Sequence, residues 1–398
     1  MNILFYTSFK PSAHKGGTER TTITLANGFK RYLGWDSYAA YVVEDGGKKE
    51  DCFLDICRVD EKKCIPQIER LIRDWEIDCF IDQGDLWIAA DINRNNLERN
   101  CRIILAYHFE PEWDNVFFSK KRLKEEVKTE SIKKKLISTI KLLFFPYFKS
   151  RYEKRLRDYC SRSYHNADRV VLLSSGYFDS YATWAGLDKD KENKFFAIPN
   201  ALSYPMDYDP GRVSEKKKRV LIVSRLDETQ KRISLALDIW KRVKQDPKAK
   251  EWSLDIVGSG EDEELYKNIV NNEHIPDVVF YGRREPKAFY EDASIFMMTS
   301  KSEGWGITIT EAMQFGVVPI VYDTVAAFKE MVIDAQNGRL IKEGATDSYC
   351  NALIELIIDD NKRQKMARES MSHCKLFEPE KIVYKWKDLI CGIQISGY

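Results

Sequence analysis

The stretch that most limits the fold of this chain runs from residue 295 to residue 323. It begins with a short apolar run that ends at Met298, and a loop containing two glycines follows. A helix-compatible segment comes next and closes at Gly316, because glycine suits the left-handed position after a helix. Pro319 prevents the helix from continuing, and Val317–Tyr322 has the apolar character of a buried strand. The order strand, loop, helix, strand predicts part of a parallel α/β sheet.

Two glutamates stand in this stretch, eight residues apart. Glu303 lies in the loop and Glu311 on the helix, so the two acids can contact opposite ends of one extended ligand. Between them, the backbone N–H groups of Gly306, Ile307 and Thr308 form a helix N-terminus, which attracts phosphate. An anionic group held there, with hydroxyl-rich groups on each side, describes a nucleotide sugar.

The residues around these acids resemble the E-x7-E motif of retaining GT-B glycosyltransferases, the group 1 family, also called family 4. Glu-Gly-Trp-Gly precedes the helix, and Glu-Ala-Met with a later Gly-x-x-Pro follows. The resemblance implies an α/β chain of two Rossmann-like domains that face each other across a cleft. It also implies transfer of a sugar with retention at the anomeric carbon. The resemblance is continuous from about residue 195 to residue 345 and looser in the first half.

The resemblance implies a role for each acid and for two cations. Glu303 would bind hydroxyls of the transferred sugar or act as a nucleophile, and both interpretations stay open. Glu311 would bind the ribose hydroxyls. Arg225 and Lys231 stand where the family carries cations that neutralise the donor diphosphate, although Ser224 replaces the family's leading glycine. Such preorganised positive charge takes the place of a metal ion, so no metal is expected.

Two further positions correspond to donor contacts in the family. Gly258 follows a predicted strand at Trp252–Val257, and the resemblance implies close packing there beside the nucleotide. Arg283 follows another predicted strand that starts at Val278, and its loop would contact the base.

The first half of the chain predicts a second parallel α/β domain, because apolar strands alternate there with helical patterns. The expected strands are Asn2–Thr7, Ser37–Val43, Cys79–Asp82, Ile103–His108, Arg169–Leu173 and Phe195–Ile198. Gly16 and Gly17 open a helix after the first strand, and the resemblance implies that their backbone lies beside the donor phosphates. His108 closes a strand, where doubly wound sheets bind ligands. The resemblance implies that it approaches the transferred sugar as a catalytic residue.

A chain of 398 residues is long for one core and suits two domains. We expect residues 1–200 to bind the acceptor and residues 201–378 to bind the nucleotide sugar. The final helix, about residues 379–398, would cross back onto the first domain, as it commonly does in GT-B proteins.

Composition narrows the class of protein further. The net charge is +1, so the chain as a whole is not expected to bind nucleic acid. Nine cysteines without zinc spacing predict free thiols in a reducing compartment. The start lacks the features of a signal peptide and no apolar run reaches the length of a membrane span, so a cytoplasmic protein is expected. Asp188-Lys-Asp190 resembles a metal-binding D-x-D, but it lies in a charged connection and is interpreted as chance.

Residues 119–157 differ from the rest of the chain. They hold fourteen basic and four acidic residues around an apolar centre that includes the aromatic residues Phe144, Phe145, Tyr147 and Phe148. This pattern favours a helix on an anionic membrane surface, which would place the protein on the inner face of the plasma membrane. A core helix with solvated charges is the alternative, and nucleic acid is a third that the rest of the chain does not support. Pro146 predicts a helix, a kink and a second helix.

The function predicted is a retaining, metal-independent glycosyltransferase. Its donor would be a UDP- or GDP-sugar, with no further cofactor. Its acceptor would be a hydroxyl of a glycan, lipid-linked as in surface-polysaccharide synthesis. A GT-B sugar-nucleotide epimerase is one alternative, although the acid/base set that it needs is not found in the sequence. A non-catalytic nucleotide-sugar-binding scaffold is another, against which the intact Arg225, Lys231, Glu303 and Glu311 argue.

Overall fold

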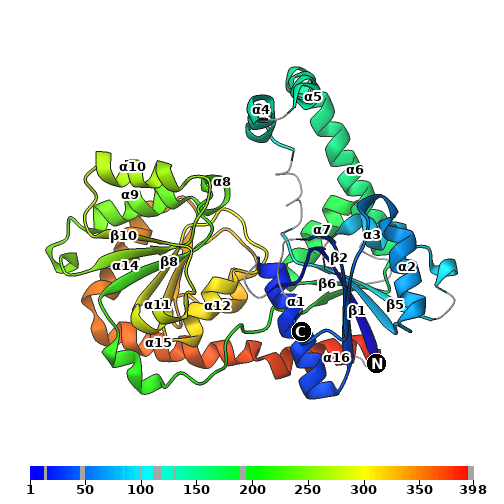
Figure 1. Cartoon of the computed structure of the whole chain (residues 1–398). Coiled ribbons are helices and arrows are strands. Elements are labelled where there is room, and N and C mark those ends of the chain that lie inside the picture. The colour runs from blue at the N-terminus through cyan, green and yellow to red at the C-terminus, as the bar shows by residue number, and fades with distance from the viewer. Residues whose placement is uncertain are drawn as a thin grey trace. The chain divides into compact units, whose positions relative to one another are not determined.

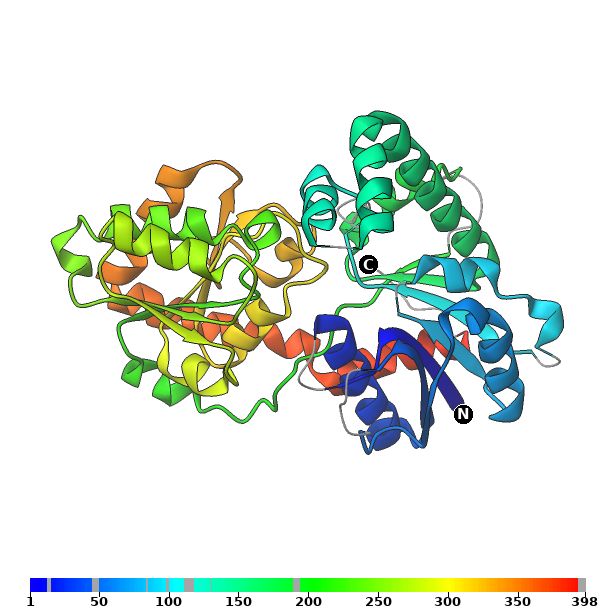
Figure 2. The same ribbon diagram turned by 45° about the horizontal axis from the view of Figure 1, so that its top comes forward.

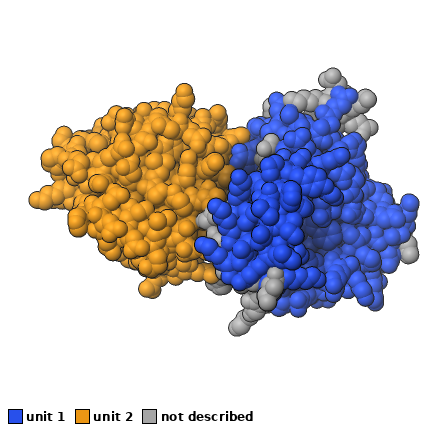
Figure 3. All heavy atoms as spheres, turned by 90° about the horizontal axis from the view of Figure 1, so that it is seen from above, with its two compact units in different colours: residues 1–198, 387–398 blue, residues 199–386 orange. Residues whose placement is uncertain are grey.

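The structure is a computed structural model that describes residues 1–12, 16–44, 50–83, 85–97, 100–110, 118–129, 131–188 and 194–392. It divides into two compact units, coloured in Figure 3. Unit 1 comprises residues 1–198 and 387–398, and unit 2 comprises residues 199–386. The sequence placed the division two residues later, at 200/201, and placed the return to the first domain at about residue 379 instead of 387.

Unit 1 is built on a parallel sheet of seven described strands in the order β3-β2-β1-β4-β5-β6-β7. The strands are β1 (Asn2–Phe9), β2 (Asp36–Val43), β3 (Asp55–Arg58), β4 (Cys79–Asp82), β5 (Arg102–Tyr107), β6 (Arg169–Leu172) and β7 (Phe195–Ala197). The helices are α1 (Gly17–Gly28), α2 (Cys64–Asp74), α3 (Leu86–Asp91), α4 (Lys120–Thr129), α5 (Ile132–Leu143), α6 (Phe145–Asn166) and α7 (Phe178–Ala185). The central strands are buried on both faces and therefore carry apolar runs, as in Ile3–Phe5 and Ile103–Leu105.

Unit 2 is built on a second parallel sheet, of six described strands in the order β10-β9-β8-β11-β12-β13. The strands are β8 (Arg219–Val223), β9 (Ser253–Val257), β10 (Val278–Gly282), β11 (Ile295–Met298), β12 (Val318–Asp323) and β13 (Arg339–Lys342). The helices are α8 (Glu228–Lys231), α9 (Ile233–Val243), α10 (Glu263–Asn272), α11 (Lys287–Asp292), α12 (Ile307–Gln314), α13 (Phe328–Met331), α14 (Thr346–Ile358), α15 (Asp360–Cys374) and α16 (Pro379–Cys391), the last of which ends in unit 1. Its core includes Trp240, Leu254, Ile256 and Leu353, all fully buried.

Each sheet has one point at which the strand order reverses. In unit 1 the chain moves outward from β1 to β3 and then returns to β4 on the other side of β1. In unit 2 it moves outward from β8 to β10 and returns to β11 on the other side of β8. Ligands of open α/β sheets bind outside the carboxyl ends of the strands at such switch points. In unit 2, the topology therefore predicts a ligand site beside the residues that follow β8 and β11.

The strands expected from the sequence are confirmed to within one or two residues at each end. Two strands were missed, β3 and β13. Each lies at the outer edge of its sheet, and half of its residues are charged, so neither has the apolar signature of a central strand. The α/β class and the two Rossmann-like sheets are those expected.

The basic stretch forms α4, α5 and the first part of α6, and these helices stand out from the rest of unit 1 in Figures 1 and 2. The chain leaves helical geometry at Phe144, whose ψ is 35°, and Pro146 occupies the first turn of α6. The predicted helix, kink and second helix are thus confirmed. Among the described residues no helix is both long enough and apolar enough to cross a membrane.

Candidate functional site

The switch point of unit 2 holds a small pocket at the carboxyl ends of β8 and β11. Its polar lining comes from Ser224, Lys231, Thr299 and Ser300, and apolar residues of β8 and β11 form its floor. The sequence predicted Lys231 here. Thr299 and Ser300 were not predicted, because only the sheet order brings the end of β11 beside the end of β8.

Lys231 on α8 and Glu303 in the loop after β11 form an ion pair at this switch point. Both side chains are nearly buried, with 14% and 11% of their surfaces exposed. The backbone at Lys231 is held in place from both sides. Asp227 caps α8 by accepting a hydrogen bond from the N–H of Thr229 at 2.9 Å, and the Thr299 hydroxyl donates to the Lys231 carbonyl at 3.0 Å. The cation therefore lies at a defined place, with a carboxylate beside it.

Arg225 lies next to this pair but reaches into solvent. Its side chain is 60% exposed, and its Nη2 donates to Gln230 Oε1 at 2.7 Å. Gln230 in turn donates from Nε2 to the carbonyl of Ser302 at 3.0 Å. This chain of contacts ties α8 to the loop that carries Glu303. The guanidinium also pairs with Oδ2 of Asp227 at 3.3 Å, and most of the Arg225 side chain stays exposed.

The loop between β11 and α12 is anchored by its aromatic residue. Trp305 is 2% exposed and meets Phe377 edge to face, with ring centroids 5.2 Å apart. Gly306 follows with φ +90°, a left-handed conformation that glycine adopts without strain. A Cβ atom there would also lie 3.0 Å from Ile309 and 3.0 Å from Phe328. The glycine thus allows the chain to turn sharply into α12.

Helix α12 begins at Ile307, where the sequence predicted a helix N-terminus. The first N–H groups of a helix have no acceptor within that helix and carry partial positive charge. Those of Ile307 and Thr308 come four and five residues after Glu303 in the chain. A phosphate bound there would be stabilised by these backbone N–H groups.

Glu311 has a different setting from the other predicted residues. It is fully buried, and the Tyr290 hydroxyl donates to its Oε2 at 2.9 Å. The Tyr290 ring stacks on Phe315, with centroids 5.9 Å apart. Tyr290 therefore covers this carboxylate, a contact that the sequence did not indicate. The ribose role of Glu311 stays a prediction.

Gly258 and Arg283 follow two adjacent strands, β9 and β10. At Gly258 φ is +142°, and a Cβ atom would lie 1.8 Å from the carbonyl oxygen of Ser224. Only glycine lets the end of β9 approach the end of β8 so closely, which shapes the backbone just before Arg225. Arg283 is exposed beyond β10, at the edge of the sheet. Its contact with a base stays a prediction.

The remaining predicted residues belong to unit 1. Gly16 and Gly17 lie at the start of α1, and Gly16 has an ordinary φ of −65°. His108 follows β5, is 7% exposed, and its Nε2 contacts Oε1 of Gln83, which follows β4. Their predicted roles beside a donor sugar are not tested by the structure of unit 1 alone.

A further carboxylate near the switch point of unit 1 was not predicted. Ser8 donates to Oδ2 of Asp85 at 2.6 Å, and burial raises the pKa of Asp85 above its usual range. The D-x-D interpreted as chance extends past the described residues, which include Asp188 but not Asp190. Within the described ranges, no group of three or more His, Cys, Asp or Glu side chains is arranged to hold a metal.

Residues 208–373 match the family model described as Glycosyl transferases group 1. Over 234 residues the chain is 26% identical to the poly(glycerol-phosphate) alpha-glucosyltransferase of Bacillus subtilis (strain 168), which covers 58% of this chain and 34% of that protein. Over 243 residues it is 25% identical to the amylovoran biosynthesis glycosyltransferase AmsD of Erwinia amylovora, covering 60% and 65%. The chain thus spans from about one third to just under two thirds of these relatives.

Among solved structures, the chain is similar to Anabaena Alr3699/HepE in complex with UDP and glucose. The TM-score is 0.72 at 16% identity, over 99% of this chain and 100% of that one. Two parallel, doubly wound sheets of this kind define the GT-B class of structures. Residues 208–373 are thus similar to the group 1 glycosyl transferases, and the chain shares its fold with this solved structure.

Proposed function

We propose that this protein transfers a sugar from a nucleotide-sugar donor to a hydroxyl of a glycan acceptor, with retention at the anomeric carbon. The observation that carries the proposal is the Lys231–Glu303 pair at the switch point of unit 2. It sets a cation for phosphate beside a carboxylate for sugar hydroxyls. The loop that carries Glu303 leads directly into the N-terminus of α12, where a phosphate would be stabilised.

In the proposed reaction, the bond between the anomeric carbon and the donor phosphate oxygen breaks. The acceptor oxygen forms a new bond on the same face of the sugar, and its proton passes to the leaving phosphate oxygen. Arg225, Lys231 and the first N–H groups of α12 stabilise the negative charge that develops on the diphosphate. When phosphate engages Lys231, Glu303 is released to accept hydrogen bonds from the sugar. These charges would act without a metal ion.

A UDP- or GDP-sugar is the proposed donor. UDP is the first choice, because the similar Anabaena structure is a complex with UDP and glucose. Arg283 and Glu311 are the proposed contacts for the base and the ribose. The names of the two relatives concern poly(glycerol phosphate) and amylovoran, which supports a polysaccharide-type acceptor.

A lipid-linked acceptor, met at the cytoplasmic face of a membrane, is the finer form of this proposal. Residues 119–157 would bring the protein to that anionic surface, and His108 with the Gly16–Gly17 turn would serve the transfer from unit 1. These assignments rest on the sequence pattern.

The test is a thermal-shift screen against UDP, GDP, ADP and their sugars, followed by transfer assays with Arg225→Ala. A nucleotide at 100 times its Kd stabilises the fold by about 2.7 kcal/mol, which a melting curve resolves. Arg225→Ala should keep the wild-type melting temperature, because its side chain is largely exposed, and should lower turnover by about 10²–10³. Arg284→Ala, at another exposed arginine, is the control. Stabilisation by none of these ligands, or full turnover in Arg225→Ala, would count against the proposal.

A further inference from the structure

Exposed apolar side chains gather on the outer part of unit 1. Of the sixteen large hydrophobic residues that are exposed among the described ones, six lie within twelve residues, and they are 41–73% exposed. We call them the α5 stripe: Leu136, Ile137, Ile140, Leu143, Phe144 and Tyr147. Such clustering on a surface marks an interaction site, whereas single exposed hydrophobic residues need no explanation.

The four residues of the stripe that lie on α5 share one face of that helix. At 100° per residue, positions 136, 137, 140 and 143 fall within an arc of about 120°. Phe144 and Tyr147 follow at the kink and in the first turn of α6. The opposite side of α5 is occupied, because Ser138 is 2% exposed and donates to Oε2 of Glu126 on α4 at 2.6 Å. Helix α4 therefore covers the inner side of α5, and the stripe faces away from it.

The aromatic residues near the end of α5 differ in their contacts, because some pack inward and others belong to the exposed stripe. Phe145 stacks on Phe118, with centroids 5.7 Å apart, and Phe118 stacks on Tyr152 at 5.3 Å. Phe145 thus helps to hold together the helical arm, as we call α4, α5 and the first part of α6. The sequence interpretation, which gave Phe145 the same outward role as Phe144, is corrected by these contacts.

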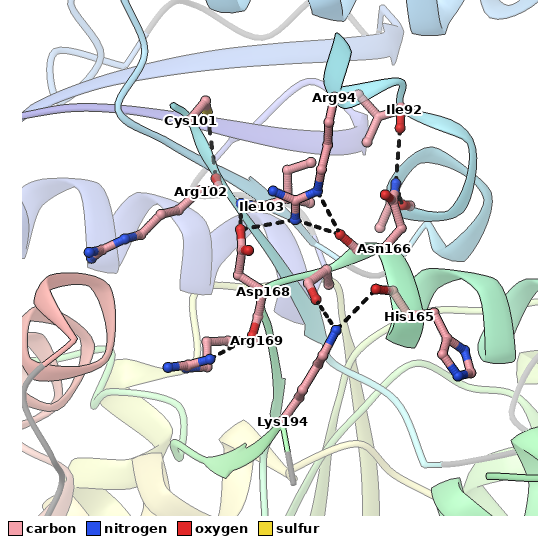
Figure 4. A network of polar contacts seen from close by, with 12 residues as sticks. Ile92, Arg94, Cys101, Arg102, Ile103, His165, Asn166, Asp168, Arg169 and Lys194 are labelled. Atoms are coloured by element: carbon pink, nitrogen blue, oxygen red, sulfur yellow. Dashed lines mark hydrogen bonds and ion pairs between the residues drawn. The ribbon is translucent and has the colours of Figure 1, made fainter. Parts of the chain in front are cut away.

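The arm is fixed to the body of unit 1 through the far end of α6, as Figure 4 shows. Lys194 Nζ donates to the carbonyls of His165 and Ala167, each at 3.0 Å. Arg94 donates to the carbonyl of Asn166 at 2.6 Å and pairs with Asp168 at 3.0 Å. Cations are favourable at a helix C-terminus, where carbonyl groups lack partners within the helix. The stripe is consequently presented at a fixed place on unit 1.

Basic residues border the stripe. Lys133 and Lys134 precede it and are exposed, Lys141 lies along one side, and Arg151 follows one turn after Tyr147 and is also exposed. An apolar face edged by lysines and arginines suits a helix that lies in the plane of an anionic bilayer, with the apolar side chains at the acyl boundary.

We propose that the α5 stripe inserts into the surface of an anionic lipid bilayer. The inference extends the membrane attachment within the proposed function. It adds a component that salt does not remove, because insertion buries apolar surface whereas attraction by charge is screened to roughly 3 Å at 1 M salt.

The experiment is co-sedimentation of the full chain with phosphatidylcholine vesicles that contain or lack phosphatidylglycerol. Binding is formed at low salt and challenged with 1 M salt. The test variant is Leu136→Gln/Leu143→Gln, since glutamine keeps the helix propensity of leucine. The matched control is Leu265→Gln/Leu376→Gln, at two leucines that are similarly exposed in unit 2. Each protein is also checked for melting temperature and for stabilisation by UDP, which separates loss of insertion from loss of the donor site.

The wild type and the control should sediment with phosphatidylglycerol vesicles, and a part should remain bound after the salt challenge. The test variant should bind at low salt and release at 1 M. Its bound fraction there should correspond to a partition constant at least tenfold lower, because burial of one large apolar side chain changes an equilibrium constant by about an order of magnitude. Equal retention of the test variant, or complete release of the wild type, would overturn the proposal. So would a wild-type dimer that the variant converts to a monomer, since the stripe would then bind a second copy.

Discussion

Replacing Lys231 by methionine removes the cation from the switch point and keeps most of the side chain's volume. Glu303 then lies nearly buried without this ammonium group. Removal of one partner of a buried ion pair costs about 3–5 kcal/mol. We take the lower end, about 3 kcal/mol, because both side chains keep some exposure to water. A unit of this size loses about 2–4 °C of Tm per kcal/mol, so unit 2 should melt about 6–12 °C lower.

Turnover should fall independently of stability. Loss of one preorganised contact to the developing charge typically lowers kcat by about 10²–10³. The double variant Lys231→Met/Glu303→Gln separates the two effects, because a neutral amide no longer needs a cation beside it. We expect it to regain most of the lost melting temperature and none of the lost turnover.

The assays are scanning calorimetry and initial-rate kinetics at saturating donor, below the melting temperature of the weakest variant. Lys301→Met serves as the control, because this lysine lies on the same loop but is exposed. It should match the wild type in both assays. Recovery of turnover in the double variant would refute the reasoning, since neither charge would then take part in transfer.

Two further predictions concern the solution conditions. Activity should survive saturating EDTA in a direct transfer assay, because protein cations take the place of a metal; loss that added magnesium or manganese restores would contradict this. Stability should rise with pH above about 7, because burial lowers the pKa of Lys216 from 10.5 to about 7, so the unfolded chain binds more protons than the folded chain between those values. Denaturant titrations from pH 7 to pH 10 should show this rise in the wild type, and Lys216→Met should lack it; equal slopes would mean that Lys216 stays charged in the fold.

The parts of the fold that could be predicted from the sequence are those with a local signature. The central strands carry unbroken apolar runs, and Gly306 and Gly316 mark the two ends of α12. Strands β3 and β13 carried no such signature. Both strands lie at the edge of a sheet, and half of the residues in each are charged. Their sequences, DICR in β3 and RLIK in β13, therefore resemble surface segments.

The residues of the site that could not be predicted depend on tertiary structure. Tyr290 meets Glu311 across 21 positions of sequence, and Thr299 meets Lys231 across 68. The residues that flank Tyr290 and Thr299 in the sequence carry no pattern that indicates these contacts. The sequence also did not indicate which face of α5 packs against α4, because apolar residues lie on both sides of α5. The contact between Ser138 and Glu126 shows which side α4 covers.

Helix α16 has a consequence for the order in which the protein can fold during synthesis. The helix starts in unit 2 and ends in unit 1, with the division after Trp386, and Leu389 and Ile390 are buried beyond it. Unit 2 is therefore inserted into the chain of unit 1. A ribosome must translate all of unit 2 before residues 387–392 emerge. Unit 1 is therefore the first unit to be synthesised and the last to be completed. Its sheet lacks the final helical turns until the synthesis of unit 2 has ended.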